Sequence, residues 1–167
     1  PFYVKQQESP MPPLPLFDLS IVDVDHPTIS QEEIYTLNPH RYEFMLLDGA
    51  YFVDVPNGIA AGYRDAKPDE FWVRGHIPGR PLFPGVLMIE TAAQLVSFQA
   101  LKMGENRGFL GFAGVDDVKF RGQVVPGQRL VMLSRALDVR PRRCVAATQG
   151  WVNGQLVFEG KITGMWL

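Results

Sequence analysis

The longest helical pattern of apolar positions lies in residues 86–103. Apolar side chains recur there at steps of three and four, as expected for one face of a helix. They are Val86, Ile89, Ala93, Val96 and Ala100. Further apolar residues fill the other faces, and a helix that is apolar nearly all round is normally buried. Gly104 predicts its C-terminal end.

Six further segments have the composition of strands. Two are predicted within residues 44–63, joined by the turn signal Pro56-Asn57-Gly58. The others are predicted at residues 112–124, 129–139, 144–152 and 156–167, with a strong hairpin signal at Asn153-Gly154. Short connections favour antiparallel pairing. We therefore predict an α+β fold in which an antiparallel six-stranded sheet wraps around one long central helix.

The N-terminal part of the chain has a different composition. Residues 1–27 form a Pro-rich arm that includes Pro10-Met11-Pro12-Pro13, which blocks helix formation. We interpret it as an arm or loop, with a partly disordered tail as the alternative. Ser30-Gln31-Glu32-Glu33 predicts a capped helix start, and that short helix should end near Leu37. Residues 28–167 are expected to form a single domain.

Charge and cysteine usage restrict the possible partners and location. The net charge of −2 argues against nucleic acid as a partner, because phosphate binding needs a basic surface. No apolar run approaches the roughly 18 residues of a membrane span, and we expect no signal peptide. Cys144 is the only cysteine, so an internal disulfide is excluded and no Cys/His metal cluster is predicted. These features favour a reducing compartment, and we predict the cytoplasm.

The most informative segment is G-H-I-P-G-R-P-L-F-P-G-V-L-M-I-E at residues 75–90, followed by Ala93-Gln94. Its prolines and glycines predict a stiff, shaped loop ahead of the helix. The segment closely resembles the signature of the 3-hydroxyacyl-[acyl-carrier-protein] dehydratases of type II fatty-acid synthesis, in their FabZ-like branch. Residues 38–42, 112–116 and 125–127 resemble further elements of that family, so the resemblance covers about residues 30–167.

The resemblance implies the hotdog fold and dehydration of (3R)-3-hydroxyacyl-acyl-carrier-protein to the trans-2-enoyl product. It implies that His76 is the base and Glu90 the acid, with His76 of one chain facing Glu90 of the other chain in a homodimer. Acyl carrier protein is the implied partner, and trimers of dimers are common in the family. The mechanism requires no cofactor or metal.

The chemistry of both residues suits these roles. Dehydration needs a base for the proton beside the thioester carbonyl and an acid for the departing 3-hydroxyl. The ordinary pKa of histidine, about 6.5, lets neutral His76 act as the base. Burial on the helix is expected to raise the pKa of Glu90 and so keep its proton available. The alternatives are that His76 only fills the loop and that Glu90 is a structural carboxyl held by Gln94.

Further residues are expected to bind the substrate or its oxyanion. The Gly85 N–H at the helix start is free to donate a hydrogen bond to a thioester oxygen, although loop geometry alone could also require this glycine. The family places residues 40–42 near the mouth of the acyl tunnel, with Tyr42 as a gate, and a simple turn is the alternative. The full set is Gly85, Gln94, Pro84, His40, Arg41, Tyr42 and Phe83.

Departures from the family pattern leave the acid/base pair intact. Ile77 replaces the usual Phe, and Glu43 stands where Pro is common. In the family an Arg often follows the Asp that corresponds to Asp48, and this chain has Gly49 there. They bear on tunnel shape and chain-length preference. Three other functions stay open: a FabA-like dehydratase that also isomerises, which carries Asp at the position of Glu90, a hotdog acyl thioesterase, and a non-catalytic acyl-binding scaffold.

Overall fold

The computed structural model describes residues 13–104 and 108–167. It contains two helices and seven strands, together with two short 3-10 turns at Leu19–Ile21 and Tyr42–Phe44. The elements are β1 (Ile29–Ser30), α1 (Gln31–Leu37), β2 (Gly49–Asp54), β3 (Ile59–Asp65), α2 (Gly85–Met103), β4 (Leu110–Phe120), β5 (Arg129–Arg140), β6 (Arg143–Val152) and β7 (Gln155–Trp166).

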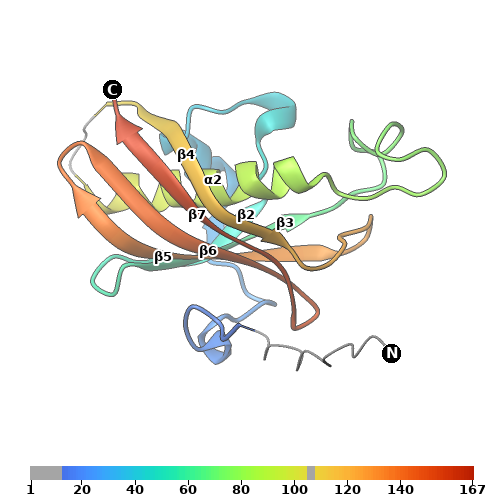
Figure 1. Cartoon of the computed structure of the whole chain (residues 1–167), viewed down its shortest axis with the longest axis horizontal. Coiled ribbons are helices and arrows are strands. Elements are labelled where there is room, and N and C mark those ends of the chain that lie inside the picture. Colours follow the sequence, from blue (N-terminus) through green and yellow to red (C-terminus); the bar gives the residue numbers. More distant parts are fainter. Residues whose placement is uncertain (1–12, 105–107) are drawn as a thin grey trace, which may run out of the picture.

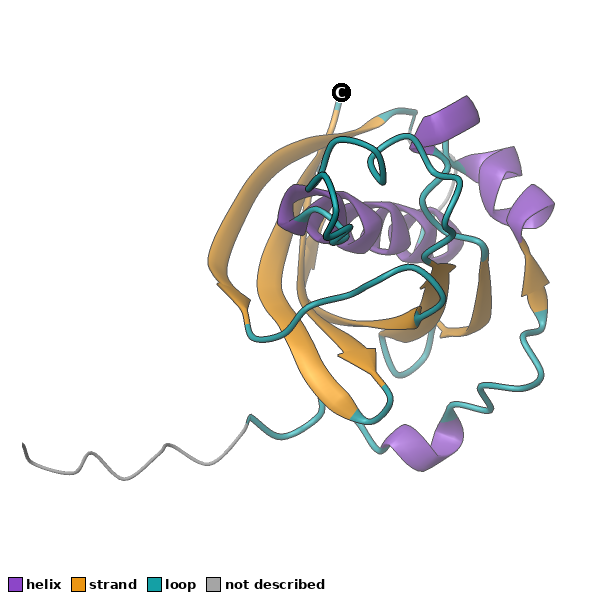
Figure 2. Cartoon of the chain, turned by 90° about the vertical axis from the view of Figure 1, so that its right-hand side faces the viewer, coloured by secondary structure: helices purple, strands orange, loops and turns teal. Residues whose placement is uncertain are grey.

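The strands form one sheet in the order β1-β2-β3-β5-β6-β7-β4, and every neighbouring pair is antiparallel. The sheet curves around α2, which lies along its concave face (Figures 1 and 2). The predicted hotdog architecture is therefore confirmed. The sequence prediction lacked one strand, because β1 is only two residues long and carries no pattern of its own.

The main core lies between α2 and the concave face of the sheet. Leu95 and Phe98 of α2 are fully buried against strand residues such as Met132 and Phe158. Burial of each such side chain stabilises the fold by about 1.5–3 kcal/mol. This apolar contact fixes α2, and with it the polar side chains that α2 carries at one edge.

Two boundaries differ from the predictions by more than two residues. The first hairpin strand begins at Gly49 and not near Phe44, because Tyr42–Phe44 forms a 3-10 turn. Strand β4 ends at Phe120 and not at residue 124, because Val124 leaves the sheet and its carbonyl accepts a hydrogen bond from the Phe83 N–H at 2.8 Å. The predicted cap of the short helix is confirmed, since the Ser30 hydroxyl accepts from the Glu33 N–H.

The described part of the N-terminal arm lies against the face of the sheet opposite α2 (Figure 1). Phe17 is buried there and packs on Phe52, with ring centroids 5.9 Å apart. Gln149 accepts from the Leu16 N–H and donates to the Leu14 carbonyl, both at 3.0 Å. Residues 14–17 of the arm are therefore anchored on the sheet, and the first residues of its Pro-rich run lie outside the described residues.

Candidate active site

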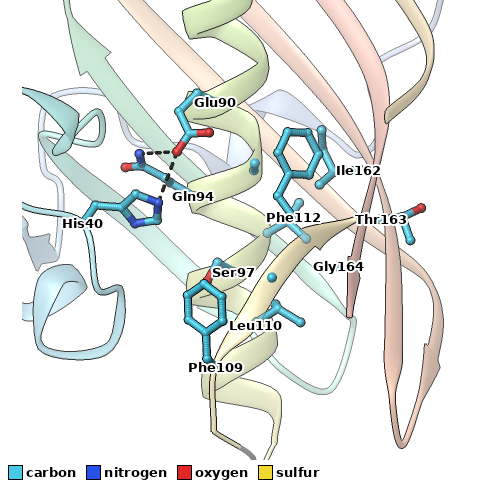
Figure 3. Close-up of a pocket in the computed structure, with 13 residues that line it drawn as sticks. His40, Glu90, Gln94, Ser97, Phe109, Leu110, Phe112, Ile162, Thr163 and Gly164 are labelled. Atoms are coloured by element: carbon cyan, nitrogen blue, oxygen red, sulfur yellow. Dashed lines mark hydrogen bonds and ion pairs between the residues drawn. The ribbon is translucent and has the colours of Figure 1, made fainter. Parts of the chain in front are cut away.

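A cavity of about 130 Å³ lies between α2 and the strands β4 and β7 (Figure 3). Glu90 and Gln94 of α2, together with His40, form a polar group on one side of it. Apolar residues of β4 and β7, including Leu110, Phe112 and Ile162, line the rest. The cavity therefore combines an ionisable carboxyl with an apolar wall.

Glu90 lies within the second turn of α2, and its side chain is 21% exposed. Its Oε1 accepts a hydrogen bond from Gln94 Nε2 at 2.8 Å and lies 3.2 Å from His40 Nε2. Burial raises the pKa of Glu90, but the contacts with His40 and Gln94 lower it more, so the pKa lies below its ordinary value. The expectation of a raised pKa is thus wrong for the single chain, because the sequence indicates the apolar surroundings and Gln94 but not the contact with His40.

Gln94 is held in one orientation by a chain of hydrogen bonds that starts at the backbone. The Leu46 N–H donates to Gln94 Oε1 at 3.1 Å, so this atom is the amide oxygen. It also accepts the proton of the Tyr35 hydroxyl at 2.6 Å, and that hydroxyl accepts the Leu47 N–H at 2.9 Å. With Oε1 acting as the acceptor, Nε2 is the donor to the Phe44 carbonyl and to Glu90. The amide therefore offers Glu90 an N–H and not an oxygen.

His40 is held beside α2 by the residues that flank it. The buried Asn38 side chain donates to the Gln94 carbonyl at 2.9 Å. The Arg41 guanidinium donates to the carbonyls of Asn38 and His40, at 3.0 and 2.6 Å. In the single chain, Arg41 therefore binds its own loop, whereas the sequence placed it among the substrate-binding residues.

His76 lies in the loop that precedes α2 and is exposed. Its Nδ1 lies 2.8 Å from the Leu82 carbonyl oxygen, and the Leu82 N–H donates to the His76 carbonyl. A carbonyl can only accept, so Nδ1 carries the proton and Nε2 keeps its lone pair. This tautomer suits a base. His76 does not line the cavity that contains Glu90, so a single chain does not bring the two residues together there.

The remaining loop residues mainly shape the start of α2. Phe83 is buried and packs edge-on against Trp72, with centroids 5.4 Å apart. Pro84 caps the helix, and its carbonyl accepts from two N–H groups of the first turn. A Cβ at Gly85 would lie 2.8 Å from the Phe120 ring, so packing alone already requires a residue without a side chain.

Tyr42 lies away from the Glu90 cavity. It is 86% exposed and lines a separate polar cavity that also contains Asp48 and Arg64. In the single chain it therefore does not close the space beside Glu90, and its predicted role as a gate stays a prediction.

The comparison with known families matches the FabA-like domain to residues 38–161. The chain belongs to the FabA-like family. One relative of this FabA-like chain, the 3-hydroxyacyl-[acyl-carrier-protein] dehydratase FabZ of Acetivibrio thermocellus, is 36% identical over 135 residues, covering 80% of this chain and 92% of the relative. FabZ of Roseiflexus sp. is 39% identical over 132 residues, covering 78% and 92%. The predicted family is therefore confirmed.

Solved structures share the FabA-like fold at low identity. The dehydratase heterocomplex ApeI:P from Xenorhabdus doucetiae has a TM-score of 0.68 at 14% identity, covering 80% of this chain and 90% of that one. A mutant thioesterase from Pseudomonas aeruginosa has a TM-score of 0.64 at 13% identity, covering 83% and 94%. The fold is thus shared by proteins named for different reactions, and only the side chains can separate them.

The contact between His40 and Glu90 was missed by reasoning from the sequence. The motif at residues 38–42 marks His40 as notable, but the two residues lie 50 positions apart and no local pattern connects them. Within the described ranges, no group of three His, Cys, Asp or Glu side chains could hold a metal ion. No described helix combines the length and hydrophobicity that a membrane crossing requires.

Proposed function

We propose that this FabA-like protein is a 3-hydroxyacyl-[acyl-carrier-protein] dehydratase of type II fatty-acid synthesis, which converts the (3R)-3-hydroxyacyl substrate into the trans-2-enoyl product and water. The likeness to the FabZ relatives carries this proposal, since it extends over 78–80% of this chain and 92% of theirs. The side chains support it, because the chain has both a histidine with a free Nε2 lone pair and a carboxyl in a cavity with an apolar wall.

In this mechanism, His76 Nε2 removes a proton from C2 of the thioester. The electron pair forms the C2–C3 double bond, and the 3-hydroxyl leaves as water with the proton of Glu90. The negative charge that builds on the thioester oxygen is stabilised by the Gly85 N–H at the start of α2. His76 gains one proton and Glu90 loses one, so transfer of a proton between them restores the starting state.

The low pKa of Glu90 in the single chain fits one half of this cycle. In the proposed cycle, the two residues carry one transferable proton between them. Carboxylate and imidazolium are the forms needed for the reverse reaction, hydration. Dehydration starts with the proton on Glu90, and a partner chain and a bound substrate that cover its exposed part would favour that form by desolvation.

We propose a homodimer in which each cavity receives His76 from the other chain. Strand β4 lies at the edge of the sheet, and an unpaired edge of this length is a template for association. Exposed apolar side chains occur on and directly before β4, in the loop before α2 and in the first turn of α2, namely Phe109, Phe112, Phe120, Ile77 and Val86. His76 is exposed and lies outside the cavity of its own Glu90. A trimer of dimers is a further proposal that rests on the family.

The carrier and location are also proposals. Acyl carrier protein is named in the relatives' activity, and we place this protein with it in the cytoplasm, with no nucleic-acid or membrane partner. Several basic side chains that could bind an acidic carrier protein already form ion pairs within the chain. Arg121 and Lys119 both contact Glu159, at 2.6 and 3.7 Å. Arg140 pairs with Asp138.

The test is hydration of crotonyl thioester, followed by loss of the ultraviolet absorbance of the conjugated enoyl group. Wild type should turn over the substrate, and folded His76→Ala should not. A cis-3 enoyl product would indicate a FabA-like isomerase, and release of free thiol would indicate a thioesterase. If neither the carrier-protein nor the coenzyme A thioester is turned over, the dehydratase proposal is contradicted and the non-catalytic acyl-binding scaffold is favoured.

A further inference from the structure

Two nitrogen atoms approach the same oxygen of Glu90. His40 Nε2 lies 3.2 Å from Oε1, and Gln94 Nε2 donates to Oε1 at 2.8 Å. Figure 3 shows both side chains converging on that oxygen, from a loop and from α2. No described residue forms a hydrogen bond with Oε2. The carboxyl group is therefore held from one side only.

The His40 ring is placed to donate from Nε2. Its Nδ1 is buried and has no partner in the described part of the chain. A proton on Nδ1 would be a buried donor without an acceptor, which costs more than an unpaired lone pair on a neutral ring. Glu90 is the only other ionisable side chain among the described residues of the cavity, and the nearby Arg41 guanidinium is bonded to backbone carbonyls. The ring nitrogen that faces Glu90 is thus the one that carries a proton.

We propose that His40 is a positioning residue, which together with Gln94 holds Oε1 of Glu90 so that the transferable proton is carried and delivered by Oε2. This inference rests on the dehydratase function proposed above. Oε1 keeps the hydrogen bond from Gln94 and the 3.2 Å contact with His40 Nε2 in both the acid and the carboxylate form, so neither side chain moves when the proton is transferred. Such preorganisation avoids a rearrangement during the chemical step.

His40 acts through Glu90 and does not itself exchange protons with the substrate. Its Nε2 is directed at the carboxyl oxygen, and its other nitrogen is buried. Loss of the donor should therefore change the orientation and the titration of Glu90, and change substrate binding little. If His40 only filled space, replacing it would leave the pKa of Glu90 unchanged and would not lower kcat more than it raised KM.

Two amide variants provide a matched pair. In His40→Gln, the side-chain nitrogen can reach the position of Nε2, whereas the shorter amide of His40→Asn reaches only the position of Nδ1. Misplacing a catalytic group by about 1 Å costs on the order of 100-fold in rate. We expect His40→Asn to lower kcat for crotonyl thioester hydration by about 10- to 100-fold with KM within about threefold of wild type, and His40→Gln to keep most of the activity.

The pH dependence gives the second readout. The acidic limb of kcat/KM for hydration reports the carboxylate of Glu90. Burial raises the pKa of Glu90, and the contact with His40 lowers it. Without this contact the pKa should rise, so the acidic limb should move to higher pH in His40→Asn and stay near the wild-type position in His40→Gln. Equal activity and equal pH profiles in wild type and His40→Asn would overturn the proposal, as would a His40→Gln variant as impaired as His40→Asn.

A measurement without turnover separates this inference from the proposed function. Infrared titration of the Glu90 carboxyl, with Glu90→Gln as the blank, follows the pKa directly in folded protein. A higher pKa in His40→Asn than in His40→Gln supports the positioning role, even if wild type does not hydrate the thioester. The same pKa in wild type and both variants refutes the role, whatever the enzyme's activity.

Discussion

The Tyr35 hydroxyl accepts the Leu47 N–H at 2.9 Å and donates to Gln94 Oε1 at 2.6 Å. The substitution Tyr35→Phe removes one oxygen atom and leaves the ring in place. Leu47 is fully buried, so its N–H loses its acceptor and cannot reach water. A buried donor left in this way costs about 1–3 kcal/mol, and we expect the free energy of unfolding to fall by that amount.

Tyr51 offers a matched control in the same domain. It is also buried, but its hydroxyl has no hydrogen-bond partner among the described residues. The neighbouring Arg129 directs its N–H groups to Asp65 and to the Val24 carbonyl. Removing an unpaired hydroxyl relieves a desolvation cost, so Tyr51→Phe should leave the free energy of unfolding within about 0.5 kcal/mol of wild type or raise it.

Urea unfolding at one fixed protein concentration compares the three proteins, because the stability of a dimer depends on concentration. Tyr35→Phe should lower the midpoint with an unchanged slope, and Tyr51→Phe should not. The reasoning would be refuted if Tyr35→Phe stayed within about 0.5 kcal/mol of wild type, or if both variants lost the same free energy.

Three further predictions concern other parts of the fold. Arg64→Ala leaves the partly buried Asp48 and Glu70 without their shared cation and should lower the free energy of unfolding by about 1–3 kcal/mol in urea, because Lys67 still contacts Asp48. Gly150→Ala places a Cβ 2.9 Å from a buried leucine side chain of β5 and should cost about 1–3 kcal/mol by overpacking in the same assay. Burial raises the pKa of the Cys144 thiol, so a disulfide reagent should modify the native protein at least about tenfold more slowly than the unfolded one.

Local patterns were sufficient to predict most of the fold. The apolar repeat of α2, the hairpin turns and the Ser30 cap each depend on neighbouring residues, so the sequence shows them directly. The pairing of β4 with β7 was not predictable in this way, because β4 joins the last strand and not the next one along the chain. The packing of Phe17 on the outer face of the sheet was also missed, because it too depends on a contact between segments far apart in the sequence.

The candidate site was predicted as a set of residues but not as an arrangement. The motif at residues 75–90 identifies His76 and Glu90, and their chemistry suggests base and acid. Their surroundings depend on contacts between distant segments. Gln94 is within one turn of Glu90 and was predicted as its partner, whereas His40 comes from the loop between α1 and β2. The predicted direction of the pKa shift of Glu90 was wrong because the contact with His40 was unknown.

The proposed mechanism requires a site shared between two chains. We would mix His76→Ala with Glu90→Gln, each inactive alone, and measure crotonyl thioester hydration after the subunits have exchanged. Each mixed dimer has one site with both groups intact and one with neither, and random exchange makes half of the dimers mixed. Recovery of about a quarter of the wild-type activity is therefore expected. No recovery in a mixture shown to contain mixed dimers would contradict the shared site, because His76 and Glu90 would then have to act within one chain.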